Sequence, residues 1–245
     1  MIRDRETLNQ LLALIDRFVT ERLIPRESEL AESGSLPEDI LDEMKAMGLF
    51  GLTIPEEYGG LGLTMEEEIE VAISLGKTSP AFRSVMGTNN GIGSAAIVFN
   101  GTEEQKRRYL PKYASGEWIS CFCLTEPEAG SDAASLKTSA VRDGDHYVIN
   151  GTKRYITNAK VADTFNVMAR TNPSIKGARG ISSFIVEKDF KGITLGSVDK
   201  KMGQAGSMTC DVIFEDCRVP AENIIGAEGE GFITAMKVLD RGRLH

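Results

Sequence analysis

The sequence predicts an α+β protein of several domains, with a helical first half, an antiparallel β region and the start of a further helix. Three observations support this fold class. Apolar residues recur at helical spacing up to about residue 115, and from Glu117 the hydrophobic period changes to two. No helical pattern separates the strands that follow, which favours an antiparallel sandwich or barrel over a βαβ unit. A last apolar helix continues toward His245 without a Gly or Pro stop.

Length and composition are typical of a soluble globular protein with material for one large domain or two ordinary ones. Of the 245 residues, 41% are hydrophobic and 26% are charged. The net charge of −8 argues against nucleic acid or an anionic membrane as a partner. The N-terminus lacks the apolar core of a secretion signal, and no apolar run approaches the ~20 residues of a membrane span. We therefore expect a protein that is not secreted and has no membrane span.

Four cysteines and two histidines limit the chemistry. Cys121 and Cys123 stand two apart in an expected strand, so they share one face and are interpreted as buried packing residues. A disulfide framework is not expected at this density, and a reducing compartment fits better. The histidines are His146 and His245, which nearly excludes a His-ligated metal site or a Ser-His-Asp triad. No metal site is predicted.

Helical spacing and capping residues define the first half of the chain. Residues 4–32 have the apolar spacing of one amphipathic helix. Ser35, Thr64 and Thr102 each stand three residues before a Glu or Gln, which is the capping-box pattern that begins a helix. The helix after Ser35 is expected to reach Met47 and to stop at the following glycine.

Residues 81–100 form a further helical segment that contains the pattern G-x-G-x-x-A at 91–96. This pattern is a dinucleotide fingerprint only where it follows a buried strand. Here it follows Met86-Gly-Thr-Asn-Asn, which has no strand character. We interpret the small residues as a thin helix face that lets another element pack close.

Short runs rich in β-forming residues occupy the second half, and turn signals such as Asn150-Gly151 and Lys191-Gly192 separate or interrupt them. The expected strands are 117–124, 135–142, 145–157, 163–170, 181–187, 192–197 and 209–216. A glycine-rich lead at 226–231 then opens the final helix.

Residues 121–138, CFCLTEPEAGSDAASLKT, are the stretch around which the chain is organised. An apolar strand breaks at Thr125, and a second strand resumes near Ser135. Such a break presents hydroxyls and free backbone N–H groups at the mouth of a strand, where a ring or a phosphate can be held. Taken alone, the stretch also fits a surface hairpin loop built from turn residues.

The literal string TEPEAGSD that follows Leu124 resembles the flavin-binding signature of the acyl-CoA dehydrogenase family. Other strings that match this family in the same order are 54–60, 101–106, 109–111, 151–158, 184–187, 201–203, 214–216, 218–220 and 229–231. They extend over nearly the whole chain. The string LTEPEAGSDAASLKTSA, the string KKMG and the closing D-x-G-R are most similar to the very-long-chain branch.

The resemblance implies a helical N-terminal domain over 1–117 and a β-barrel middle domain over 118–227. Residues 228–245 would then be the first turns of a truncated C-terminal four-helix bundle. FAD is the implied cofactor, bound between the middle domain and the bundle and contacted in part by a second subunit. A homodimer or homotetramer in the bacterial cytoplasm or the mitochondrial matrix is implied as well.

Candidate site residues follow from the same motifs. The residues implied to bind FAD are Phe122, Leu124, Thr125, Gly130, Ser131, Tyr155, Ile156 and Thr157, and those implied to bind the acyl-CoA are Ser131, Asp240 and Arg243. Tyr155 stands where the family usually has tryptophan, so an aromatic plane is kept with less stacking area. Without the resemblance, Tyr155 fits core packing, and the segment from Asp240 to Arg243 fits a solvated helix face.

The implied reaction is α,β-dehydrogenation of a fatty acyl-CoA thioester. A carboxylate base takes the α-proton, the β-hydrogen leaves as hydride to the flavin, and an electron-transfer flavoprotein takes the electrons. Small residues at 91–96, where the family shapes the bottom of its acyl pocket, favour a long-chain substrate. No catalytic residue is assigned within the chain.

The base is expected beyond His245, because Gly242 stands where the isovaleryl and long-chain branches carry a glutamate. The 245 residues alone are then expected to be inactive. Two alternatives stay open: a related flavin oxidase or monooxygenase, and a non-catalytic fragment that acts as an interaction module.

Overall fold

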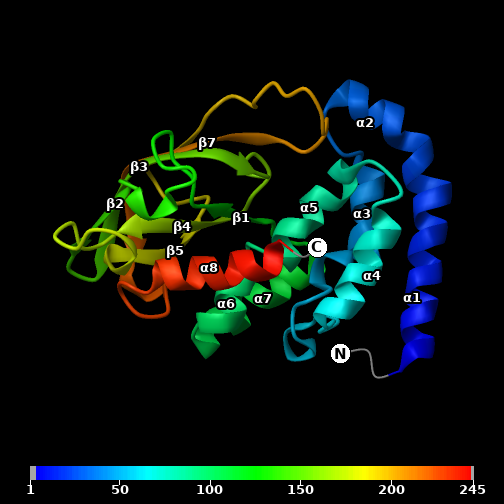
Figure 1. The fold of residues 1–245 in the computed structure, drawn as a ribbon, viewed down its shortest axis with the longest axis horizontal. Coiled ribbons are helices and arrows are strands. Elements are labelled where there is room, and N and C mark those ends of the chain that lie inside the picture. Colours follow the sequence, from blue (N-terminus) through cyan, green and yellow to red (C-terminus); the bar gives the residue numbers. More distant parts are fainter. Residues whose placement is uncertain (1–3, 244–245) are drawn as a thin grey trace.

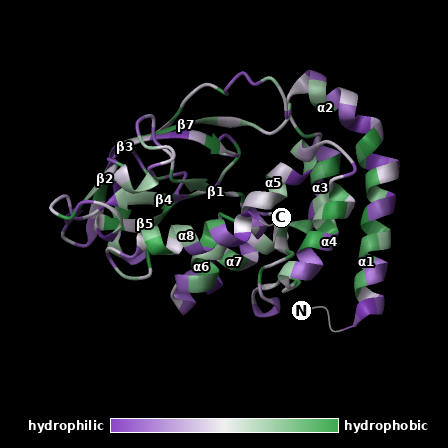
Figure 2. Cartoon of the chain, in the orientation of Figure 1, coloured by the Kyte–Doolittle hydropathy of each residue, from purple (hydrophilic) through white to green (hydrophobic). Residues whose placement is uncertain are grey.

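A computed structural model of the chain describes residues 4–243. Figure 1 shows a helical half beside a β half, with the last helix, α8 (Gly231–Gly242), lying against the sheet and close to α6 and α7. The helices of the first half are α1 (Arg5–Phe18), α2 (Glu27–Ser33), α3 (Glu38–Ala46), α4 (Met65–Leu75), α5 (Pro80–Asn90), α6 (Ala95–Asn100) and α7 (Glu103–Ser115). Figure 2 shows hydrophilic and hydrophobic residues mixed along these helices, as expected where one face is buried.

The capping boxes at Thr64 and Thr102 are confirmed. Each threonine side chain accepts the backbone N–H three residues later, from Glu67 or Gln105, whose own side chain accepts the threonine N–H. The box at Ser35 is wrong, because Pro37 is the N-cap residue of α3 and no side chain caps that helix.

Two long helical segments are broken where the prediction had them continuous. Residues 4–32 divide into α1, a π-helical turn at Val19–Leu23, a 3-10 turn at Ile24–Arg26 and α2. Pro25 lies in the 3-10 turn, and its missing N–H and its ring disfavour a regular helix there. The segment 81–100 divides at Gly91 into α5 and α6. The pattern G-x-G-x-x-A therefore follows a helix, and the rejection of a dinucleotide fingerprint is confirmed.

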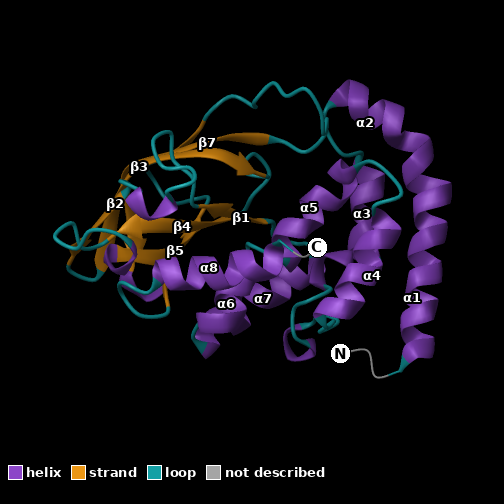
Figure 3. Ribbon diagram, viewed as in Figure 1, coloured by secondary structure: helices purple, strands orange, loops and turns teal. Residues whose placement is uncertain are grey.

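The second half is one mixed sheet, drawn in orange in Figure 3. Its strands are β1 (Ser120–Cys123), β2 (Ser139–Asp143), β3 (His146–Thr157), β4 (Thr164–Arg170), β5 (Ile181–Glu187), β6 (Ile193–Leu195), β7 (Thr209–Pro220) and β8 (Ile224–Ile225). The strand order is β6-β7-β3-β2-β4-β5-β8, and β1 pairs with β4.

The predicted antiparallel barrel is wrong in two respects. The β1–β4 pair is parallel, with Cys121 opposite Phe165, and β2 meets β4 in parallel at a single residue pair. The strand order also runs from β6 to β8 without closing. The expected start of a strand at residue 135 is wrong as well, because Ala133–Ser135 is a 3-10 turn and β2 begins at Ser139.

One hydrophobic cluster joins the two halves and α8. It contains Tyr109 from α7, Phe122 from β1, Met168 from β4 and Ala235 from α8, all buried. A second cluster fills the helical half, and a third lies between the strands. Because the joining cluster draws on both halves, their relative position is held by buried apolar surface rather than by a linker. The domain limits at 117/118 and 227/228 stay predictions.

The cysteine interpretation is confirmed within the described residues. All four cysteines are free and buried, and the sulfurs of Cys121 and Cys123 lie 3.8 Å apart on one face of β1. His245 lies outside the described residues. Between residues 4 and 243, no helix is both long and apolar enough to cross a membrane, and no group of His, Cys, Asp or Glu side chains is arranged to hold a metal ion.

Candidate functional site

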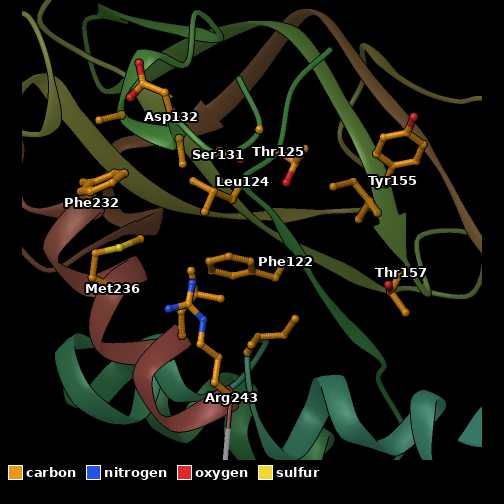
Figure 4. Close-up of a pocket in the computed structure, with 16 residues that line it drawn as sticks. Phe122, Leu124, Thr125, Ser131, Asp132, Tyr155, Thr157, Phe232, Met236 and Arg243 are labelled. Atoms are coloured by element: carbon orange, nitrogen blue, oxygen red, sulfur yellow. The ribbon is translucent and has the colours of Figure 1, made fainter. Parts of the chain in front are cut away.

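A cavity of about 460 Å³ lies where the end of β1 faces α8, as Figure 4 shows. All eight residues predicted from the flavin motifs line it, namely Phe122, Leu124, Thr125, Gly130, Ser131, Tyr155, Ile156 and Thr157. Arg243 also lines it and reaches from the end of α8 toward Phe122. Asp240 does not line this cavity and is exposed on α8.

A buried ion pair holds the loop that carries Gly130 and Ser131. The ammonium of Lys153 on β3 donates to the Leu124 carbonyl at 3.2 Å and lies 2.8 Å from Glu126 Oε1. The Glu126 carboxylate also accepts the backbone N–H groups of residues 137 and 138, at 2.6 and 2.9 Å. Glu126 thus closes the loop 126–138 at its two ends, and Lys153 balances its charge.

Burial and charge act against each other in this pair. Burial lowers the pKa of Lys153, while the charge of Glu126 opposes that change. Burial would raise the pKa of Glu126, but Lys153 and the backbone N–H donors outweigh it, so this pKa is lowered. We infer that both groups are charged in the folded protein near neutral pH.

A bulge in β3 turns Tyr155 outward beside the cavity. The register between β3 and β7 shifts between Lys153 and Ile156, and Tyr155 has φ of 58°, a left-handed conformation that is uncommon for an aromatic residue. Its side chain is 61% exposed, and the Arg154 guanidinium lies 4.4 Å from the ring centroid. Arg154 is itself held by Asp211 at 2.6 Å. A large aromatic face is therefore held in place at the cavity edge without being buried.

Hydrogen-bond donors at the cavity have no acceptor within residues 4–243. The hydroxyls of Thr125, Ser131 and Thr157 make no hydrogen bond to the described residues. The backbone N–H groups of residues 124, 125 and 130–132 likewise find no acceptor there. Donors left free beside a cavity, next to apolar walls, are the arrangement expected of a site for a polar planar ligand that also carries phosphate.

Residues of α8 complete the cavity, and the sequence motifs did not identify them. Phe232, Met236 and Leu239 line it from the helix. Their spacing of four and three residues along one helix face was the available signal, since such a stripe marks the buried face of α8. The family motifs in this helix pointed only to the charged residues Asp240 and Arg243.

A second cavity, of about 180 Å³, lies beside the first one. Its lining residues are Arg83, Ser84, Gly87, Thr88, Ile92, Thr157 and Gly242. Thr157 and Ile92 line both cavities, so the two are neighbours at the end of β3. The sequence reasoning did not single out Arg83, although a charged residue in the otherwise small and apolar run at 81–87 was a visible signal.

The sequence suggested that the small residues of segment 91–96 form the bottom of an acyl pocket, but they do not. A Cβ on Gly93 would lie 2.0 Å from Ser120 Oγ and 2.7 Å from the Thr88 carbonyl. The glycine is therefore needed for close packing of the α5–α6 turn on β1, which confirms the close-packing interpretation of these residues. Of the segment, Ile92 is the residue that lines the two cavities.

Known proteins share both the sequence and the architecture. The family model of the acyl-CoA dehydrogenase N-terminal domain matches residues 5–117, and that of the middle domain matches 121–217. A short-chain specific acyl-CoA dehydrogenase of Clostridium acetobutylicum is 41% identical over 244 residues, covering 100% of this chain and 63% of the relative. The very long-chain specific mitochondrial enzyme of Macaca fascicularis is 41% identical over 245 residues, covering 97% of this chain and 37% of the relative.

Solved structures agree with these relatives. Butyryl-CoA dehydrogenase from Megasphaera elsdenii superposes with a TM-score of 0.92 at 34% identity, over 99% of this chain and 64% of that one. An acyl-CoA dehydrogenase from Bacillus anthracis complexed with FAD superposes with a TM-score of 0.89 at 37% sequence identity. The match covers 98% of this chain and 42% of that one. The chain thus spans less than two thirds of the length of these proteins. Its sequence matches and its fold lead to one conclusion: the chain belongs to the acyl-CoA dehydrogenase family, of which it carries the N-terminal and middle domains.

Proposed function

We propose that the protein dehydrogenates a fatty acyl-CoA thioester at the α and β carbons with FAD as cofactor, and passes the electrons to an electron-transfer flavoprotein. The observation that carries this proposal is the group of unpaired donors around the larger cavity, next to Phe122 and Tyr155. These donors match the hydrogen-bonding needs of FAD. The pyrimidine edge of a flavin needs both donors and acceptors, and its pyrophosphate needs N–H groups where few cations are present.

Each part of the cavity then has a task. The N–H and hydroxyl of Thr125 would meet the ring edge, and the loop at Gly130 and Ser131 would hold the pyrophosphate. Tyr155 would cover a ring face, and Arg243 would contact the acyl-CoA from α8. When bound, the flavin accepts the hydride from the β carbon. Thr157, which lines both cavities, would hydrogen-bond the flavin ring at the point nearest the acyl chain.

The second cavity would receive the acyl chain. The long-chain preference expected from residues 91–96 loses its basis, because Gly93 packs on Ser120 instead of facing a cavity. The residues lining the second cavity include no carboxylate. The base that takes the α-proton would therefore come from a part of the full-length enzyme outside these lining residues, and a homodimer or homotetramer would complete the flavin contacts.

The full-length protein is expected to be yellow and to retain FAD through gel filtration. Addition of its acyl-CoA substrate without oxygen should bleach the flavin absorbance, and an artificial acceptor should restore it with turnover. A colourless protein would contradict the flavin assignment. Hydrogen peroxide formed in air at the rate of substrate oxidation would favour the oxidase alternative instead.

Replacing Thr157 with valine in the full-length enzyme is expected to weaken transition-state stabilisation by about 1–3 kcal/mol, because a desolvated donor to the flavin is lost while shape is kept. Turnover and the flavin redox potential should both change. Thr152→Val on the same strand is the matched control, since Thr152 lines neither cavity. If Thr157→Val leaves both the potential and turnover at the parent's values, the assignment of Thr157 to the flavin is wrong.

A further inference from the structure

Arg170, the last residue of β4, bonds through its guanidinium to four backbone carbonyl groups. Nε donates to Leu136 at 3.1 Å and Nη2 donates to Ala134 at 2.8 Å. Nη1 donates to Ile175 at 3.0 Å and to Gly177 at 3.1 Å. Within residues 4–243, no carboxylate oxygen lies within 4.0 Å of this guanidinium. The side chain therefore joins two loops, and no ion pair among the described residues neutralises its charge.

The first of these loops forms a wall of the larger cavity. Gly130, Ser131 and Ala134 line that cavity, and Figure 4 shows Ser131 on this wall. Arg170 does not line the cavity itself. It supports the wall from outside, because it bonds to the carbonyls of Ala134 and Leu136.

A short chain of contacts connects this support to the free donors of the loop. The segment Ala133–Ser135 is a 3-10 turn. Ser135 donates its N–H and its hydroxyl to the Asp132 carbonyl, at 3.1 and 2.7 Å. The backbone N–H groups at 130–132 have no acceptor within residues 4–243. Their position therefore depends on the turn that Arg170 holds.

The second loop, between β4 and β5, is shaped to fit the guanidinium. A Cβ on Gly180 would lie 2.6 Å from the Ile175 carbonyl oxygen and 2.9 Å from Arg170 Nη1. Glycine is needed there because the backbone approaches so closely. On the other side, the backbone N–H of Arg170 donates to the Thr138 carbonyl at 2.7 Å. The arginine is therefore held in one position between the two loops.

Arg170 also brings a positive charge to a loop whose other cations are neutralised. Lys153 and Lys137 bond to the same loop, but they are paired with Glu126 and Glu128. Arg170 is bound to neutral carbonyls instead. Its charge therefore acts on any anion that lies against the opposite side of the loop.

We propose that Arg170 is a positioning residue for the pyrophosphate of the cofactor. It sets the free N–H groups at 130–132 in the wall of the larger cavity, and its charge favours an anion in front of them. The flavin ring, which the proposed function assigns to Thr125 and Tyr155, does not depend on it. This inference rests on the proposed function, since it takes the ligand of the loop to be FAD.

The test compares two flavins that share the ring and differ in phosphate. Full-length apoenzyme, prepared by removing its flavin, is titrated with FAD and with riboflavin, and binding is followed by flavin fluorescence. Arg170→Gln should raise the Kd for FAD about tenfold or more and leave the Kd for riboflavin within about twofold of the parent's. Arg170→Lys should weaken FAD binding less, because it keeps the charge without the planar fork.

Salt gives a second measurement on the same proteins. The Kd for FAD should rise more steeply with ionic strength in the parent than in Arg170→Gln, because salt screens the attraction between phosphate and guanidinium. Arg142→Gln is the matched control. Arg142 on β2 donates to the Gly144 carbonyl at 3.3 Å, and neither residue lines the cavity. This change should leave both Kd values and the salt dependence unchanged.

The two measurements separate positioning of the pyrophosphate from general support of the fold. An Arg170→Gln enzyme that loses affinity for both flavins equally, or that binds FAD as the parent does, overturns the inference and leaves the proposed function standing. Equal salt dependence of the two proteins overturns it as well, and decides the test if riboflavin binds too weakly to titrate. If circular dichroism shows that Arg170→Gln does not fold, Arg170→Lys carries both measurements. A full-length parent that binds neither flavin would instead sink the proposed function.

Discussion

Lys153→Met is expected to lower the free energy of unfolding by about 3–5 kcal/mol, because it leaves the Glu126 carboxylate buried without its counter-charge. Lys153 is 0% exposed and Glu126 is 7% exposed. The loss should appear as a lower midpoint in urea with an unchanged m value. Because Glu126 closes the loop 126–138, the same variant should also bind FAD more weakly in the full-length enzyme.

The double variant Lys153→Met, Glu126→Gln is expected to be more stable than Lys153→Met alone, since no unpaired charge remains. Lys137→Met is the matched control on the same loop. Lys137 pairs with Glu128, and both are exposed and screened by solvent, so Lys137→Met should leave the free energy of unfolding nearly unchanged. Equal stability of Lys153→Met and the parent would show that the buried pair does not support this loop.

Low pH should destabilise the protein through the Lys153–Glu126 pair. The folded-state pKa of Glu126 lies below its ordinary value of 4.5, so its contribution to stability is complete above that value and is lost as pH falls through the folded-state pKa. Stability of the parent should therefore fall more steeply below about pH 4.5 than that of Glu126→Gln. Parallel acid profiles for the two proteins would contradict the charged pair.

Asn89→Ala is expected to destabilise the protein by about 3 kcal/mol or more, because several buried groups lose their partner at once. The Asn89 amide donates to the carbonyls of Tyr113 and Trp118, at 3.0 and 2.8 Å. Its oxygen accepts the Ser120 N–H at 2.8 Å. The side chain is 0% exposed and ties α5, the end of α7 and the start of β1 together.

Asn172→Ala is the control that tests whether the loss of stability is specific to Asn89. Asn172 lies on the surface loop after β4, where its side chain accepts one backbone N–H, from Ser174 at 3.0 Å. That change should cost about 0.5 kcal/mol or less. If Asn89→Ala unfolds at the same urea concentration as Asn172→Ala, the junction between the helical half and β1 does not depend on Asn89.

Local signals predicted several parts of the structure well. The capping boxes at Thr64 and Thr102 formed because all of their atoms lie within four residues of one another. The strand at 181–187 was predicted with its observed limits, since a continuous apolar run between turn residues is a local property. The literal strings predicted the family, and all eight residues assigned from them to FAD line one cavity, whereas Asp240, assigned to the acyl-CoA, does not.

Local signals failed where another residue, a close neighbour in one case and a distant partner in the others, decides the outcome. The spacing of Ser35 fits a capping box, but Pro37 takes the N-cap position of α3. The period of two does not say which strands pair or in which direction, and the sheet contains the parallel pair β1–β4. Gly93 had the composition of a cavity wall, and its role depends on Ser120, which the fold brings to within 2.0 Å of its Cβ position.

The sequence by itself determined that a helical half precedes a β half and a last helix, two of the three expected caps and the membership of the family, because each of these depends on neighbouring residues or on a literal string. Only the tertiary structure decided that Lys153 balances Glu126 and that α8 completes the larger cavity. It also brought Arg83, which no motif marks, beside Thr157. The physical reason is that charge balance, burial and cavity shape depend on side chains that are far apart in the sequence and meet only in the folded protein. Local sequence patterns do not show which of these side chains come into contact.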